Sequence, residues 1–109
     1  MGSDQAFVDF VVDQLAEDLG VTQRKMFGEY ALYSHGVIFA LVCDDQLFFK
    51  PTQGGRAYIG DVVEAPAYPG ARSSFLIGER IEDGEWLSEL VRVSVRELPP
   101  PKPRKAKRK

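Results

Sequence analysis

The side chains that most often act as nucleophiles or general bases occur once each in this sequence. The single histidine, His35, lies in a Ser-His-Gly segment, and the single cysteine, Cys43, closes the longest apolar run. A cysteine–histidine pair could act as a nucleophile and its base, and the spacing allows it, but no flanking signature supports it. A zinc site would need two carboxylates besides this pair. We therefore expect a turn residue at His35 and a small buried thiol at Cys43.

Carboxylate clusters and a glycine pair are the other candidates for chemistry. Asp44-Asp45 is typical of a turn, and Glu82-Asp83-Gly84-Glu85 is typical of a helix start; neither has the spacing of a calcium loop. Gly54-Gly55-Arg56 could bring backbone N–H groups to an anion at a helix start, but it matches neither a P-loop nor a dinucleotide fingerprint. We assign no catalytic, metal-binding or cofactor-binding residue, and we expect a protein that is not an enzyme.

One segment has the composition of a recognition patch, because two bases precede a glycine that aromatic residues flank. Within a strand, such a glycine is typical of a bulge with core aromatics on either side. The alternative is a small exposed patch on which an aromatic and an arginine anchor a protein partner. The candidate partner patch comprises Arg24, Lys25, Met26, Phe27, Gly28, Glu29 and Tyr30.

Basic residues are concentrated at the C-terminus. Residues 1–98 hold all 16 acidic and 8 of the 14 basic residues, a net charge of −8, whereas residues 99–109 carry +6. The tail is proline-rich and has almost no apolar surface to bury, so we expect it to be disordered. It could bind polyanions weakly through counterion release, or serve only as a solubilising terminus. The candidate polyanion contacts are Lys102, Arg104, Lys105, Lys107, Arg108 and Lys109.

Length and composition point to one small globular domain over residues 1–98. The chain has 109 residues, of which 44% are hydrophobic and 28% are charged, which is ordinary for a soluble domain. No apolar run approaches the roughly 18 residues that a membrane span needs. The lone cysteine and the lack of a basic segment leading into an apolar stretch predict a cytoplasmic protein.

Hydrophobic periodicity predicts alternating helices and strands. Apolar residues recur every three or four positions over residues 4–19, which is typical of an amphipathic helix, and Gly20 is placed to end it. Val37–Cys43 is continuously apolar, as in a central strand buried on both faces or on one face in an oligomer contact. The expected elements are a helix at 4–19, strands at 24–34, 37–43 and 46–50, a short helix at 56–63, a loop or irregular edge strand at 64–71, a strand at 73–77 and a helix from 82 or 83.

The order α-β-β-β-α-β-β-α, with tight turns between strands, predicts an α+β fold. It is expected to have two layers, an antiparallel sheet with helices on one face. Such an arrangement leaves the other face to be solvated or paired, so a homodimer is one expectation.

Three segments resemble the TfoX N-terminal domain family. Residues 25–33, Lys-Met-Phe-Gly-Glu-Tyr-Ala-Leu-Tyr, are similar to its Met-Phe-Gly-Gly-x-Gly-Leu-Tyr stretch. Residues 36–42 resemble its Gly-x-x-Phe-Ala-Leu element, residues 45–50 resemble Asp-x-Leu-Tyr-Leu-Lys, and Arg56-Ala57 sits where the family often has a similar pair. Glu29 and Ala31 replace the usual glycines, and residues 73–76 stand where paired tyrosines are common.

The resemblance implies a two-layer fold like that of secretion chaperones. Longer relatives regulate natural competence in bacteria together with the cyclic-AMP receptor protein, and their separate C-terminal helical domain is replaced here by the basic tail. The family motif carries no catalytic residues. We therefore expect a non-enzymatic regulatory or adaptor domain that binds a protein partner, linked to transcription or competence regulation. The alternatives are a direct nucleic-acid binder that uses the tail, and a small ligand-binding protein or enzyme.

Overall fold

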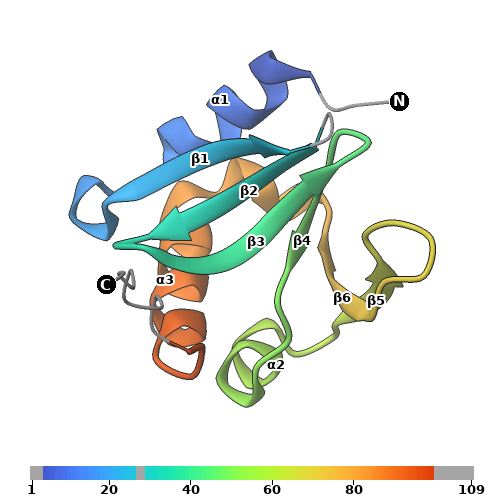
Figure 1. The fold of residues 1–109 in the computed structure, drawn as a ribbon. Coiled ribbons are helices and arrows are strands. Elements are labelled where there is room, and N and C mark those ends of the chain that lie inside the picture. Colours follow the sequence, from blue (N-terminus) through green and yellow to red (C-terminus); the bar gives the residue numbers. More distant parts are fainter. Residues whose placement is uncertain (1–3, 27–28, 100–109) are drawn as a thin grey trace, which may run out of the picture.

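The computed structural model describes residues 4–26 and 29–99. Its sheet has six strands, and Figure 1 shows the helices that accompany them. Phe27, Gly28 and the six basic residues of the tail lie outside the described residues. The elements are α1 (Gln5–Gln14), the 3₁₀ turn η1 (Glu17–Leu19), β1 (Val21–Met26), β2 (Glu29–Ser34), β3 (Val37–Cys43), β4 (Gln46–Phe49), α2 (Gln53–Ile59), β5 (Val63–Pro66), β6 (Ser73–Ile77), the 3₁₀ turn η2 (Glu79–Glu82) and α3 (Gly84–Val95).

The sheet is antiparallel throughout, in the order β1-β2-β3-β4-β6-β5. Two-residue turns join its central strands. His35 and Gly36 have φ values of 49° and 86°, and Asp44 and Asp45 have φ values of 54° and 56°. Two successive left-handed residues match the twist of the flanking strands, as in type I′ hairpins. The predicted turn roles of His35 and of the aspartate pair are therefore confirmed.

The expected single strand at 24–34 is wrong, because two strands occupy this region. Met26 at the end of β1 is paired with Glu29 at the start of β2, so the chain reverses between them. A glycine bulge within one continuous strand is therefore excluded. Most of β1 is polar, and it lies at the edge of the sheet, where pairing with β2 rather than hydropathy determines the strand.

The first two helices, α1 and α2, have different bounds from those expected. The α-helix ends at Gln14, and the chain continues through extended Leu15 and η1 to Gly20, which is left-handed at φ 57°. The predicted helix at 56–63 begins earlier, at Gln53, because Thr52 accepts a hydrogen bond from the N–H of Gly55, and it also ends earlier, at Ile59, because Gly60 has a φ of 86° and Val63 already belongs to β5. In the last helix, Asp83 caps the N-terminus of α3 as expected and accepts a hydrogen bond from the N–H of Trp86.

The core lies between the sheet and the layer formed by α1 and α3. Val8 and Val11 of α1 and Leu87 and Leu90 of α3 are fully buried in one cluster with strand side chains. The fold is therefore the predicted α+β, with one strand more than expected. The buried strand residues in that cluster are Tyr30, Leu32, Phe39, Ala40, Val42, Leu47, Phe49, Phe75 and Ile77.

Membrane-spanning helices are absent from the described part of the chain. None of its helices is both long enough and apolar enough to cross a bilayer.

Candidate functional site

The sheet face turned away from α1 and α3, here called the open face, carries a continuous apolar row. The register pairs Ala31 with Leu41, Leu41 with Phe48, Phe48 with Leu76, and Leu76 with Val63. The row therefore crosses five neighbouring strands, from β2 to β5. An antiparallel sheet with one solvated face normally alternates apolar and polar residues, so this second apolar face is unusual for a surface open to water.

Several open-face side chains are buried although they do not belong to the main core. Ala31, Cys43 and Phe48 are at most 4% exposed, yet the cluster around α1 and α3 does not include them. Leu41 and Ile38 are partly exposed, and Val63 is 58% exposed at the edge strand. The protein thus has apolar side chains on both sides of the sheet, of which only one is covered by helices.

The connection between β5 and β6, residues 67–72, forms a wall along this face. It appears in Figure 1 as the yellow loop beyond the sheet edge, and it turns where the N–H of Ala71 donates to the carbonyl of Tyr68. Two adjoining hollows of about 650 and 530 Å³ lie beside it. Both are lined by Ile38 and Leu41 of β3, by Lys50 and by Tyr68.

Each hollow has its own polar residues. Cys43 and Glu29 line the larger one, whereas Arg72 and the serines at 73 and 74 line the smaller one. Within the described residues, neither Lys50 nor Arg72 makes an ion pair. Glu29 differs, because its carboxylate accepts a hydrogen bond from the N–H of Asp44. The apolar floor is therefore bordered by two cations that no described carboxylate neutralises.

The predicted partner patch is divided by the fold. Arg24 and Lys25 are exposed on the edge strand β1, as a recognition surface requires. Tyr30 is only 3% exposed, and its hydroxyl donates to Oε1 of Gln5, so it offers no aromatic surface to a partner. Arg24 is paired with Ala31, which places it at the β1 end of the apolar row.

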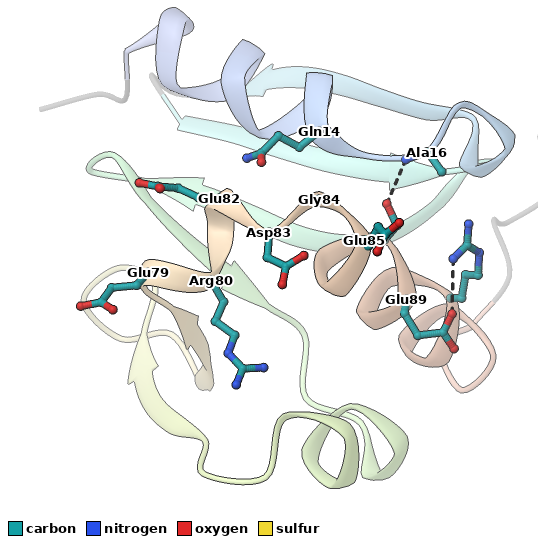
Figure 2. Close-up of a pocket in the computed structure, with 11 residues that line it drawn as sticks. Gln14, Ala16, Glu79, Arg80, Glu82, Asp83, Gly84, Glu85 and Glu89 are labelled. Carbon is teal, nitrogen blue, oxygen red and sulfur yellow. Dashed lines mark hydrogen bonds and ion pairs between the residues drawn. The ribbon is translucent and has the colours of Figure 1, made fainter.

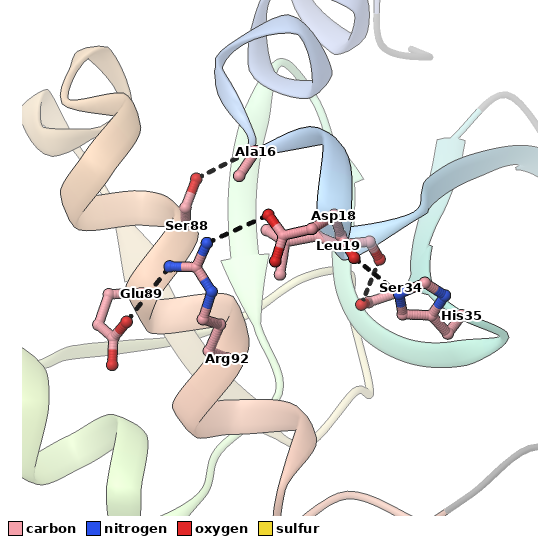
Figure 3. Close-up of polar contacts among 8 residues, drawn as sticks. All are labelled: Ala16, Asp18, Leu19, Ser34, His35, Ser88, Glu89 and Arg92. Atoms are coloured by element: carbon pink, nitrogen blue, oxygen red, sulfur yellow. Dashed lines mark hydrogen bonds and ion pairs between the residues drawn. The ribbon is translucent and has the colours of Figure 1, made fainter.

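His35 connects the β2–β3 turn to the segment around η1, as Figure 3 shows. Its Nε2 lies 2.8 Å from the carbonyl oxygen of Asp18, and its backbone N–H donates to the carbonyl of Gly20. The neighbouring Ser34 hydroxyl donates to the carbonyl of Leu19 at 2.6 Å. These contacts attach the β2–β3 turn to η1, which is a structural role.

Cys43 lies at the opposite end of β3 from the turn that contains His35. Seven strand residues correspond to more than about 20 Å, so the two side chains do not form a nucleophile–base pair. Burial, with a smaller contribution from the negative charge of Glu29, raises the pKa of the Cys43 thiol to about 11. The thiol is therefore protonated at neutral pH and is a poor nucleophile.

The glycine pair in the first turn of α2, Gly54 and Gly55, does meet an anion, but that anion belongs to the protein. The carboxylate of Glu97 accepts from the N–H groups of Gln53 at 3.0 Å and Gly54 at 2.6 Å. A Cβ at Gly54 would lie 2.5 Å from Oε2 of Glu97, so the glycine permits this approach. The expectation that a backbone approaches an anion here is correct, and Glu97 is that anion.

An acidic hollow lies between the end of α1, η2 and α3. It measures about 1150 Å³ and is broad and open. Figure 2 shows its carboxylates spread along η2 and the start of α3 rather than converging on one point. Arg80 lies over the ring of Trp86, and Arg92 pairs with Glu89. In the described ranges no group of three or more histidine, cysteine, aspartate or glutamate residues could hold a metal ion.

Tyr68, Lys50 and Arg72 are the open-face residues that sequence reasoning did not single out. Two of them border or belong to the segment expected to be a loop, and nothing in their local sequence connects them to β3. The continuous apolar character of Val37–Cys43 did indicate two apolar faces. Only the strand order and register show which side chains share the second face.

Comparison with known proteins finds one similar protein and one family. The chain is 38% identical over 109 residues to a protein of Spirochaeta aurantia described as an uncharacterized 12.7 kDa protein in the trpE 5′ region. The alignment covers all of this chain and 95% of that protein. No solved structure gives a significant match. The family model for the TfoX N-terminal domain matches residues 13–98, which include all six strands and α3, and the chain therefore belongs to the TfoX N-terminal domain family.

Proposed function

We propose that this protein is a non-enzymatic regulatory or adaptor domain that binds a protein partner on its open face. The observation that carries the proposal is the apolar row from Ala31 to Val63, in which Leu41 and Leu76 are partly exposed and Val63 is exposed, with exposed Arg24 at one end. Exposed apolar patches on small domains commonly mark interaction surfaces, and arginine is enriched among interface anchors. The partner would lie across β2, β3 and β4, next to the edge strand β1.

The roles of the other candidate residues support recognition rather than catalysis. His35 is engaged in a turn, Cys43 is buried with a raised thiol pKa, and Glu97 occupies the start of α2. Family membership adds a context, because longer relatives act in competence and transcription control. We therefore propose a component or regulator of the bacterial transcription machinery as the partner, in the cytoplasm.

Replacing Leu41 by lysine tests this proposal. Leu41 is central to the row and partly exposed, so Leu41→Lys places a charge in the interface without emptying the main core. Phe10→Lys is the matched control, because Phe10 is 44% exposed on α1, in the layer on the other side of the sheet. Both variants and the parent protein would be immobilised and exposed to purified RNA polymerase and cyclic-AMP receptor protein, after their melting temperatures have been compared.

Binding by the parent and by Phe10→Lys, with loss in Leu41→Lys, supports the proposal. Equal binding by all three proteins would exclude the open face as the partner site. A second copy of the chain is the competing occupant, and light scattering distinguishes it: a dimer dissociated by Leu41→Lys would make the homodimer the open-face interaction.

Nucleic-acid binding by the basic tail is the second candidate function, favoured by its charge of +6 against −8 in residues 1–98. Anisotropy of labelled duplex DNA, measured over a salt series with the full chain and with residues 1–98, separates the two. Contact by the tail alone predicts binding that disappears on truncation and has a log–log salt slope no steeper than about −5. Sequence-selective binding by residues 1–98 would contradict the adaptor proposal, because it would make the folded domain a DNA reader.

A further inference from the structure

The two hollows beside residues 67–72 combine an apolar floor with two cations that make no ion pair within residues 4–26 and 29–99. Ile38 and Leu41 form the floor, Tyr68 stands at the side, and Lys50 borders both hollows. Arg72 adds a second cation in the smaller hollow. Volumes of about 650 and 530 Å³ lie within the roughly 300–1,000 Å³ range of small-molecule sites.

We propose that this groove binds a small amphipathic carboxylate, a molecule with an unbranched or aromatic apolar body and one anionic end. The apolar body would lie over Ile38 and Leu41 against the ring of Tyr68. The carboxylate would lie between Lys50 and Arg72, where a charge-assisted hydrogen bond can form to each cation. Leu41 also lies in the apolar row proposed above as the protein-binding surface, so the carboxylate and a protein partner would compete for it; the test below uses the carboxylate alone.

The distribution of charge sets the direction of the ligand. Glu29 lines the larger hollow and repels an anion there, while Lys50 lies where the two hollows adjoin and Arg72 lies in the smaller one. The carboxylate therefore belongs at the Lys50–Arg72 side and the apolar body in the larger hollow, toward Cys43. The same charges disfavour the basic C-terminal segment as an occupant, although Leu98 and Pro99 line the smaller hollow.

Neither cation is already used by the fold. Within residues 4–26 and 29–99 the ion pairs involve Arg56 and Arg92, and Lys50 and Arg72 make none. Lys50 is partly buried beside apolar side chains, and this partial desolvation strengthens its attraction for an anion that brings its own apolar surface. Selectivity for an anionic over a neutral molecule of equal length is therefore the distinguishing property of this site.

Titration of the full-length protein with decanoate, followed by calorimetry and by ¹H–¹⁵N spectra, tests the proposal. Decan-1-ol is the neutral probe of equal chain length. The site variant is Lys50→Gln with Arg72→Gln. Its matched control is Arg80→Gln with Arg96→Gln, which removes the same charge from two exposed residues that line neither hollow.

We expect saturable binding of decanoate, with amide shifts concentrated in β3, β4 and residues 67–72. The site variant should bind at least about tenfold more weakly, because one charge-assisted hydrogen bond is worth about that factor, and the control should bind like the parent. Equal affinity for decanol, unchanged affinity in the site variant, or shifts confined to α1 and α3 would overturn the proposal. Absence of binding, with a dimer in solution that covers the open face, would overturn it as well.

Discussion

Removing the carboxylate of Glu97 should destabilise the whole domain, although this residue follows the last helix and is exposed. Its two oxygens accept hydrogen bonds from the N–H groups of Gln53 and Gly54, at the start of α2. Charge-assisted hydrogen bonds to buried groups are worth about 1.5–3 kcal/mol each. Water competes for an exposed carboxylate, so the pair should act like one helix cap, which contributes about 1 kcal/mol.

We therefore expect Glu97→Ala to lower the free energy of unfolding by about 1 kcal/mol, or about 4–8 °C in Tm for a domain of this size. Urea unfolding followed by circular dichroism measures the change. Glu97→Gln should retain part of the effect, because its amide oxygen can accept one of the two bonds. Arg96→Ala is the control, since Arg96 is an exposed neighbour at the same end of α3.

A double-mutant cycle with Gly54→Ala makes this reasoning refutable. Alanine is about 1 kcal/mol better than glycine within a helix, but a Cβ at Gly54 would displace the Glu97 carboxylate from its position 2.5 Å away. Gly54→Ala should thus stabilise the Glu97→Ala protein more than it stabilises the parent. An equal effect in both backgrounds, or a Glu97→Ala protein as stable as the Arg96→Ala control, would show that the carboxylate does not stabilise α2.

Three further predictions concern Leu90 in the core, the thiol of Cys43, and Gly20 at the end of η1. Leu90→Ala should cost about 2–5 kcal/mol in urea unfolding, because Leu90 is fully buried, whereas Phe10→Ala should change stability by less than about 0.5 kcal/mol. Cys43 should react with a thiol reagent at pH 8 at least about 100-fold more slowly than in the protein unfolded by guanidinium, because its pKa is raised from 9.0 to about 11. Since the folded protein favours the protonated thiol, the contribution of Cys43 to folding stability is present below pH 9 and lost as the pH rises toward 11. Gly20→Ala should lower the free energy of unfolding by about 1–2 kcal/mol or more, because φ is +57° and a Cβ would lie 2.6 Å from the His35 ring. In the double variant, His35→Ala should remove the clash but not the cost of the left-handed backbone. Fully additive effects of the two changes would contradict the predicted clash.

The parts of the fold that could be predicted are those that local chemistry determines. Val37–Cys43 is a strand because it is apolar and lies between two turns, and those turns use residues that tolerate positive φ. The strand Val21–Met26 could not be predicted in the same way, because its polar residues become a strand only by pairing with β2. The start of α2 was missed for a related reason: glycines at 54 and 55 disfavour a helix locally, and Glu97 stabilises it from 43 residues away.

The candidate site was less predictable than the fold. Arg24 and Lys25 of the predicted patch are exposed, whereas alternation along β2 turns Tyr30 toward α1. Side chains from five strands form the apolar row, so its existence depends on register, which no single segment encodes. Lys50 and Arg72 are 22 residues apart in sequence, and they line the same hollow only because residues 67–72 lie beside β3.

The hydrogen bonds of Glu97 also hold the chain next to one of the hollows on the open face. By attaching the end of α3 to the start of α2, it fixes where the chain leaves the domain, and the next two residues, Leu98 and Pro99, line the smaller hollow of the open face. Lys50 and Arg72 line the same hollow, on a domain whose residues 1–98 carry a net charge of −8. Anionic ligands would be drawn to this end of the open face in particular, and their affinity should fall as the salt concentration rises.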